Sequence, residues 1–88
     1  MTDIATGSQV RAARNALAWS IEKLSELAGV SVRTIIRYES TDLVPASRGG
    51  NLVKIIAAFE AAGIEFIGSP DDAPGIRIHR PKSPQNSV

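Results

Sequence analysis

The chain has 88 residues and a net charge of +1, which is room for one small domain and too little charge to indicate nucleic-acid binding by itself. It has no cysteine, which excludes disulfides and thiolate metal sites and indicates a reducing compartment, so we expect a cytoplasmic protein. No apolar run approaches the roughly 20 residues of a membrane span, and the start "MTDIATGS" does not resemble a signal peptide. We expect no membrane partner.

Helical spacing of apolar residues predicts four helices, in the segments "QVRAARNALAW", "IEKLSELA", "VRTIIRYE" and "LVKIIAAFEAA". A residue that can cap a helix stands before or at the start of each: Ser8, Ser20, Ser31 and Asn51. Gly29 and Gly63 are typical of the turns that end helices. The segment "STDLVPASRGG" breaks the helical period and predicts an ordered loop. Trp19 and Phe59 are expected in the core.

After Gly63 the apolar residues alternate with polar ones, in "IEFI" and "IRIH", around the turn-rich segment "GSPDDAPG". This pattern predicts a β-hairpin over residues 64–79. An isolated hairpin is marginal in water, so its apolar side needs cover from the helices or from a second copy of the chain. That side comprises Ile64, Phe66, Ile76 and Ile78. The hairpin is thus part of the same domain or a dimer interface, and residues 80–88 are expected to form a disordered tail. The predicted fold is mostly α, a small bundle of about four helices with a short C-terminal hairpin.

The third predicted helix, in "GVSVRTIIRYE", is two-sided. At about 100° per residue, it has an inward side, an outward side and a flank. The inward side carries Ile35, Tyr38 and Glu39. The outward side carries Arg33 and Arg37, and the flank carries Val32 and Ile36. The two arginines thus lie opposite the apolar stripe, and the flank either packs against a loop or partner or touches DNA.

A helix, a short turn that holds glycine and a second helix with outward arginines form the outline of a helix-turn-helix. Ser25 is small where the two helices approach each other, Gly29 lies in the turn, and Ile35 anchors the second helix. With this spacing, "WSIEKLSELAGVSVRTIIRYES...VP" resembles the Cro and cI-type (Xre-like) family of DNA-binding regulators. The resemblance extends over residues 8–63 and implies that they form a helix-turn-helix DNA-binding domain.

Within that domain, the resemblance implies a positioning helix at 21–28 and a recognition helix at 32–39. It further implies roles for individual residues. Base edges would be contacted by Val32, Arg33 and Arg37, phosphates by Ser20, Thr34, Arg48 and Asn51, and an ion pair would join Arg14 to Glu39. Two positions depart from the family: Ile21 stands where a phosphate-binding glutamine is common, and no glycine follows the recognition helix. Asp42 would therefore sit in a loop near the DNA backbone.

The chemistry of these side chains supports DNA recognition. Arginine can donate two hydrogen bonds to guanine O6 and N7, and Arg33, near the start of its helix, is the better placed to do so. Arg37 could reach a guanine or a phosphate. Val32 could contact a thymine methyl group. Ser31 and the first N–H groups of its helix can face a phosphate, which the helix dipole favours.

Little in the sequence indicates an enzyme. The single histidine, His79, lies near the end of a predicted strand without a cysteine or carboxylate cluster beside it. Asp71 and Asp72 are one adjacent acidic pair, which is poor support for a calcium site. We expect no catalytic residue, no metal and no cofactor.

Two functions remain open. The first is a sequence-specific regulator of transcription that binds double-stranded DNA as a homodimer and represses by occupancy, with half-sites about 10 base pairs apart. The second is a helix-turn-helix module that docks another protein, as an antitoxin-like or adaptor subunit, with weak or no DNA binding. Ile36 on the flank and Ile21 at a phosphate position favour the second. Salt dependence separates them, because DNA binding through Z phosphates falls with a log-log slope of about −0.9Z.

Overall fold

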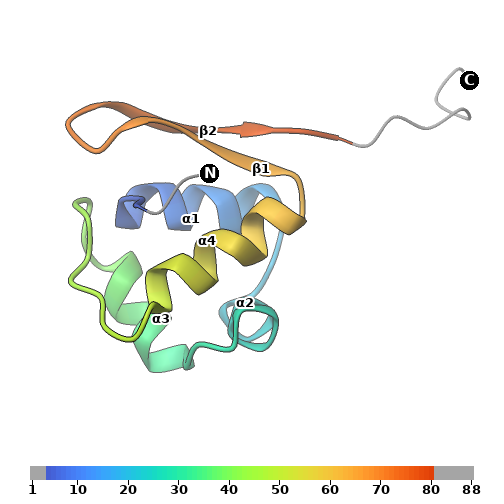
Figure 1. The fold of residues 1–88 in the computed structure, drawn as a ribbon. Coiled ribbons are helices and arrows are strands. Elements are labelled where there is room, and N and C mark those ends of the chain that lie inside the picture. Colours follow the sequence, from blue (N-terminus) through green and yellow to red (C-terminus); the bar gives the residue numbers. More distant parts are fainter. Residues whose placement is uncertain (1–3, 81–88) are drawn as a thin grey trace, which may run out of the picture.

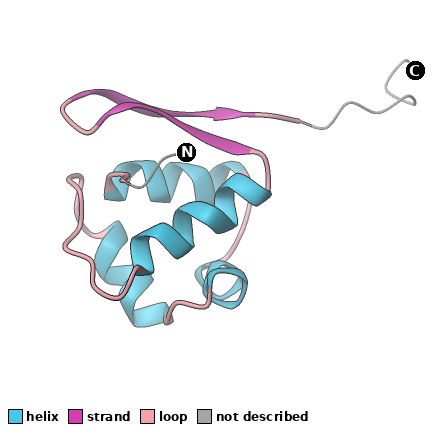
Figure 2. Cartoon of the chain, viewed as in Figure 1, coloured by secondary structure: helices cyan, strands magenta, loops and turns pink. Residues whose placement is uncertain are grey.

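The computed structural model describes residues 4–80 and contains four helices followed by a two-stranded antiparallel hairpin (Figures 1 and 2). In chain order the elements are α1 (Gly7–Ala16), α2 (Ile21–Ala28), α3 (Val32–Glu39), α4 (Asn51–Ala61), β1 (Ile64–Ser69) and β2 (Asp72–Ile78). The predicted mostly α fold with a C-terminal hairpin is confirmed. The predicted disordered tail lies, from residue 81 on, outside the described residues. No helix within residues 4–80 has the length and apolar character to cross a membrane.

The hairpin and the helix-turn-helix occupy opposite sides of the molecule (Figure 1). Strand β2 contacts α1 and strand β1 contacts α4, while α2 packs on α3 and α4. Helix α3 packs against α1 and α2. The outer surface of α2 and α3 therefore faces away from the hairpin.

Aromatic rings join the helices to the hairpin. The rings of Trp19 and Phe59 stack, with centroids 5.5 Å apart and planes 16° apart, and Phe66 of β1 lies 6.0 Å from Phe59. Phe59 is fully buried and Trp19 packs against the core, as predicted. On the other side of the core, the buried Tyr38 donates a hydrogen bond to Ser47 in the loop after α3. These contacts place the recognition-helix candidate, α4 and the hairpin around one core.

The hairpin has the predicted apolar side. Ile64 pairs with Ile78, and Phe66 pairs with Ile76. Ile64 and Phe66 are buried, whereas Ile78 at the end of β2 is 40% exposed. The predicted loop from Gly68 to Gly75 is wrong, because the strands continue to a pair between residues 69 and 72. A register shift between Ile67 and Ser69 leaves Gly68 opposite two residues of β2, Ala73 and Pro74, as in a β-bulge.

The start of α1 differs from the prediction. Thr6, not Ser8, is the N-cap: its side chain accepts from the Gln9 backbone N–H, and the Gln9 side chain accepts from the Thr6 N–H. The helix then begins at Gly7, which passes close to the loop after α3. A Cβ at Gly7 would lie 2.0 Å from the carbonyl oxygen of Thr41, so only glycine fits there.

The start of α4 also differs. Its N-cap is Gly50, in the left-handed conformation (φ 73°) and without a side-chain capping bond, and Asn51 is already the first helical residue. The predicted cap at Asn51 is therefore wrong. The predicted caps Ser20 and Ser31 are confirmed: each hydroxyl accepts from the backbone N–H three residues later, at Lys23 and Thr34.

Candidate nucleic-acid interface

The turn between α2 and α3 is held by local hydrogen bonds. Gly29 adopts the left-handed conformation (φ 71°), which glycine reaches without strain, and its N–H donates to the Ser25 carbonyl at 2.9 Å. The Ser25 hydroxyl donates to the Val30 carbonyl at 2.6 Å, and Val30 is buried. The turn therefore has a fixed geometry, which sets how α3 projects from α2.

Helix α3 is two-sided as predicted. Ile35, Tyr38 and Glu39 are buried, with exposed fractions of 0, 0 and 8%. Arg33 and Arg37 are exposed. The two residues of the flank differ in exposure: Val32 is half-buried and Ile36 is 53% exposed.

The two arginines differ in their surroundings. The Arg37 guanidinium lies 5.3 Å from the centre of the Tyr38 ring, a distance at which a cation is attracted to the aromatic face. Arg37 also lines a pocket of about 300 Å³ together with Leu43 and Val44 from the loop after α3. Arg33 lies one turn nearer the start of the helix, on the outward side.

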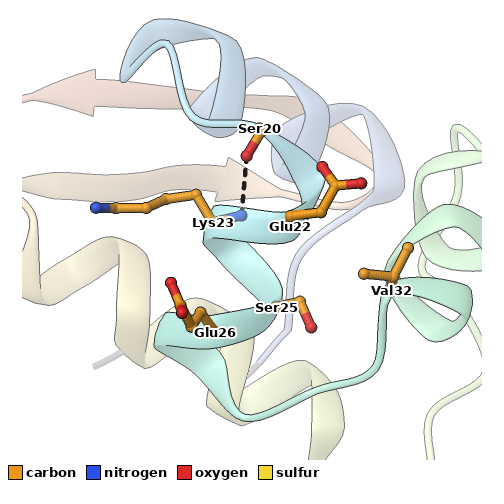
Figure 3. Close-up of a pocket in the computed structure, with 6 residues that line it drawn as sticks. All are labelled: Ser20, Glu22, Lys23, Ser25, Glu26 and Val32. Carbon is orange, nitrogen blue, oxygen red and sulfur yellow. Dashed lines mark hydrogen bonds between the residues drawn. The ribbon is translucent and has the colours of Figure 1, made fainter.

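A concave surface lies between α2 and the start of α3 (Figure 3). Its volume is about 480 Å³, and it brings together two of the predicted contact residues, Ser20 and Val32. Glu22 and Glu26, one turn apart on α2, line the same hollow with Lys23 and Ser25. Lys23 offsets only part of the charge of the two carboxylates, so the hollow works against the predicted phosphate contact at Ser20, since like charges repel.

The remaining predicted phosphate contacts lie at the starts of α3 and α4. The Ser31 hydroxyl donates to the Thr34 hydroxyl at 2.9 Å while it accepts from the Thr34 N–H at 3.2 Å. Arg48 is exposed in the loop before α4, and its carbonyl accepts from the Asn51 N–H at 3.2 Å. Asn51 is half-buried. Gly50 makes no side-chain capping bond, but the Leu52 N–H in the first turn donates to the Ser47 hydroxyl at 3.0 Å.

Arg14 and Glu39 form a two-point ion pair between α1 and α3. Arg14 Nε lies 2.8 Å from Oε2 of Glu39, and Nη2 lies 2.9 Å from Oε1. Arg14 Nη1 donates to the Trp19 carbonyl at 3.0 Å. The side chains are 17% and 7% exposed, and the hydrogen bond with Glu39 raises the pKa of Arg14. The pair joins the last residue of α3 to α1 and to the segment that leads into α2.

A second arginine of α1, Arg11, holds the loop after α3. Its Nη1 donates to the carbonyls of Glu39 and Thr41, and its Nη2 lies 2.6 Å from Oδ1 of Asp42. The Ser8 hydroxyl donates to the same carboxylate oxygen at 2.9 Å. The hydrogen bond from Arg11, followed by that from Ser8, holds the pKa of Asp42 below its ordinary value. The sequence reasoning missed Arg11, because no short-range pattern connects residues that are 31 positions apart.

The only histidine of the chain belongs to a surface cluster on the hairpin. His79 Nε2 lies 2.6 Å from Oε1 of Glu65, and Arg77 Nη1 lies 3.2 Å from the same oxygen. The hydrogen bond to His79 is the main cause that lowers the pKa of Glu65. Across residues 4–80 the structure has no group of three or more potential metal-ligating side chains of histidine, cysteine, aspartate or glutamate.

Comparison with known protein families bears on this surface. Residues 20–51 match the model of the MerR family regulatory protein. The match extends from the cap of α2 to the first residue of α4, about a third of the chain. It supports a helix-turn-helix DNA-binding regulator, and it points to a regulatory protein, not to an enzyme. It does not single out the Cro and cI-type family. No curated protein matches the chain.

Proposed function

We propose that this protein is a sequence-specific regulator of transcription that inserts α3 into the major groove of double-stranded DNA. One observation carries the proposal: the exposed arginines Arg33 and Arg37 lie on the outer side of α3, within the segment that matches a DNA-binding regulator family. An eight-residue helix held by a rigid turn is a suitable reading element, because the major groove admits an α-helix.

The proposed base readers are Val32, Arg33 and Arg37. Arg33, near the N-terminal end of α3, donates both of its fork hydrogens to a guanine. Arg37 leaves the ring of Tyr38 to reach a second guanine or a phosphate, so its contact costs a cation–π interaction of about 0.5–1 kcal/mol. Val32 packs on a thymine methyl group.

The proposed phosphate contacts surround α3. They are Ser20, Ser31, Thr34, Arg48 and Asn51. The Ser20 hydroxyl accepts from its own helix, so it can still offer its proton to a phosphate oxygen. The Ser31 hydroxyl donates to the Thr34 hydroxyl, and Thr34 can in turn offer its proton to the phosphate. Arg48 supplies a full charge, and the positive end of the α4 dipole lies beside it and favours an anion.

We further propose that the protein acts as a homodimer and represses transcription by occupying its operator, in the manner of the Cro and cI-type family. Two copies of α3 would enter successive major grooves, with half-sites about 10 base pairs apart. Residues 8–63 would then be the DNA-binding domain, with the hairpin either part of that domain or part of the dimer interface. The site of action would be the cytoplasm.

The test is selection from a random pool of DNA duplexes, followed by affinity titration of the winning sequence at several salt concentrations. The same titrations are run with Arg33→Ala, Arg37→Ala and the control Arg77→Ala, which removes one positive charge from the hairpin. We expect a two-fold-related motif in which Arg33→Ala relaxes a guanine position, at about 1–3 kcal/mol of lost discrimination. Arg77→Ala should leave the motif unchanged, since the hairpin lies on the other side of the fold.

A second candidate function is supported by exposed apolar side chains around α3. Ile36 on the helix and Leu43 in the following loop are 53% and 73% exposed, which is unusual for a surface that meets only phosphates. Under this reading α3 docks another protein. A well-folded sample that enriches no duplex, and whose weak DNA binding is insensitive to both arginine substitutions, would favour this function over the first.

A further inference from the structure

The length of α3 determines what its C-terminal end meets, if the proposed DNA binding holds. Eight residues at about 1.5 Å each make a helix about 12 Å long, which is close to the width of the major groove. In a helix-turn-helix the N-terminal residues of the recognition helix contact base edges, so the C-terminal end of α3 would lie away from the bases, toward the phosphates that line the groove. Whatever follows Glu39 is therefore close to negative charge.

Asp42 is the acidic residue in that position. It follows the last residue of α3 by three positions, so it lies within about 10 Å of the end of the helix. Its side chain is 79% exposed. Exposed charges repel within about one Debye length, which is about 10 Å at 0.1 M salt, so a free carboxylate there would repel the DNA backbone at this or lower salt.

We propose that Arg11 is a positioning residue for DNA binding: it closes the C-terminal end of α3 and holds the Asp42 carboxylate against α1, away from the DNA backbone. The Glu39 carbonyl to which it donates is one of the acceptors that the end of a helix leaves without internal partners, and the Thr41 carbonyl follows in the loop. Its charge also lies at the negative end of the α3 dipole. One guanidinium thus serves both the end of the helix and the acidic loop.

The neighbouring backbone supports the same arrangement. The Gly7 N–H donates to the Leu43 carbonyl at 2.9 Å, so the loop is tied to α1 on both sides of Asp42. Arg11 Nη2 also donates to the Ser8 hydroxyl at 3.2 Å, which in turn donates to Asp42. Lysine could not replace this contact set, because an ammonium group lacks the planar fork that reaches several oxygens at once.

A double-mutant cycle tests the proposal, with Arg11→Ala, Asp42→Asn and the combined variant titrated against the duplex selected by the wild type. We expect Arg11→Ala to weaken binding by about tenfold at ~0.1 M salt, because Asp42 is freed. Asp42→Asn alone should change affinity by less than about twofold, since its amide oxygen still accepts from Arg11. In the Arg11→Ala background, Asp42→Asn should increase the affinity for DNA by at least about threefold. Arg77→Ala, an equal loss of charge on the hairpin, is the control.

Three results would overturn the proposal. If Arg11 simply contacts a phosphate, Asp42→Asn will have the same effect in both backgrounds. If Arg11→Ala binds like the wild type, Arg11 has no part in binding, although the proposed function stands. If the wild type selects no DNA, the proposed function fails and this inference fails with it.

A conservative variant guards against a folding defect. Arg11→Lys keeps the charge, and we expect an unchanged unfolding midpoint with binding about threefold weaker and faster amide exchange at Leu43. Wild-type affinity in this variant would equally count against a positioning role.

Discussion

At the scale of single residues, Glu39 illustrates how charge is accommodated at the edge of a small core. Its carboxylate is almost completely buried, and a buried charge is tolerated only when it is paired and hydrogen-bonded. Both of its oxygens are bound by the Arg14 guanidinium. Because the pair links α1 to the end of α3, it affects stability and the orientation of the recognition-helix candidate together.

Arg14→Ala should lower the free energy of unfolding by about 3 kcal/mol, because it leaves the Glu39 carboxylate buried without a partner. Urea denaturation followed by Trp19 fluorescence measures this loss. The matched control is Arg77→Ala, which breaks the exposed pair with Glu65 and should cost less than about 1 kcal/mol. An Arg14→Ala protein as stable as the wild type would show that the pair contributes nothing.

At the scale of elements, Gln9 connects α1 to both strands of the hairpin. Its side-chain amide donates to the carbonyls of Ile67 and Gly75, at 3.2 and 2.8 Å. Its oxygen accepts from the Thr6 N–H at 2.8 Å. One buried side chain therefore completes the cap of α1 and fixes the position at which the hairpin crosses it.

Gln9→Glu separates these two roles, since it keeps the acceptor for Thr6 and removes the donor to the hairpin. We expect a loss of at least about 2 kcal/mol, because two carbonyls lose their partner and face a carboxylate. Amide hydrogen exchange should accelerate in β1 and β2 beyond the global change. Asn15→Asp, the same chemical change at an exposed position of α1, should cost under about 1 kcal/mol. Equal effects of the two substitutions would argue against the Gln9 bridge.

At the scale of the whole molecule, the question is whether the hairpin and the helices unfold as one unit. We propose that they do, because Phe66 of β1 is buried against Phe59 of α4. Phe66→Ala should cost about 3–4 kcal/mol and lower the denaturation midpoint equally for amides of the helices and of the hairpin. Ile78→Ala, at the exposed end of β2, should cost far less. A hairpin that melts first, with the helices unaffected, would show two independent units.

The predictable part of the site is the part that depends on neighbours in the chain. The two-sided α3, the turn at Gly29 and the caps at Ser20 and Ser31 all follow from residues within one or two helical turns of each other. The caps of α1 and α4 were not predicted. At α1 a local signal existed and was missed, because Thr6 and Gln9 have the Thr-x-x-Gln spacing of a capping box. What no local pattern records is the close approach of Gly7 to the loop after α3.

The sequence by itself determined four helices, a hairpin with an apolar side, and a helix with arginines opposite its buried stripe, because hydrophobic period and glycine turns act over short distances. Only the tertiary structure decided that the hairpin packs on α1 and α4, opposite α3. It also decided that Arg11 reaches Asp42 and that Gln9 joins both strands. Those contacts join residues 31 to 66 positions apart, and such pairings are selected by the packing of the complete core, which no single segment specifies.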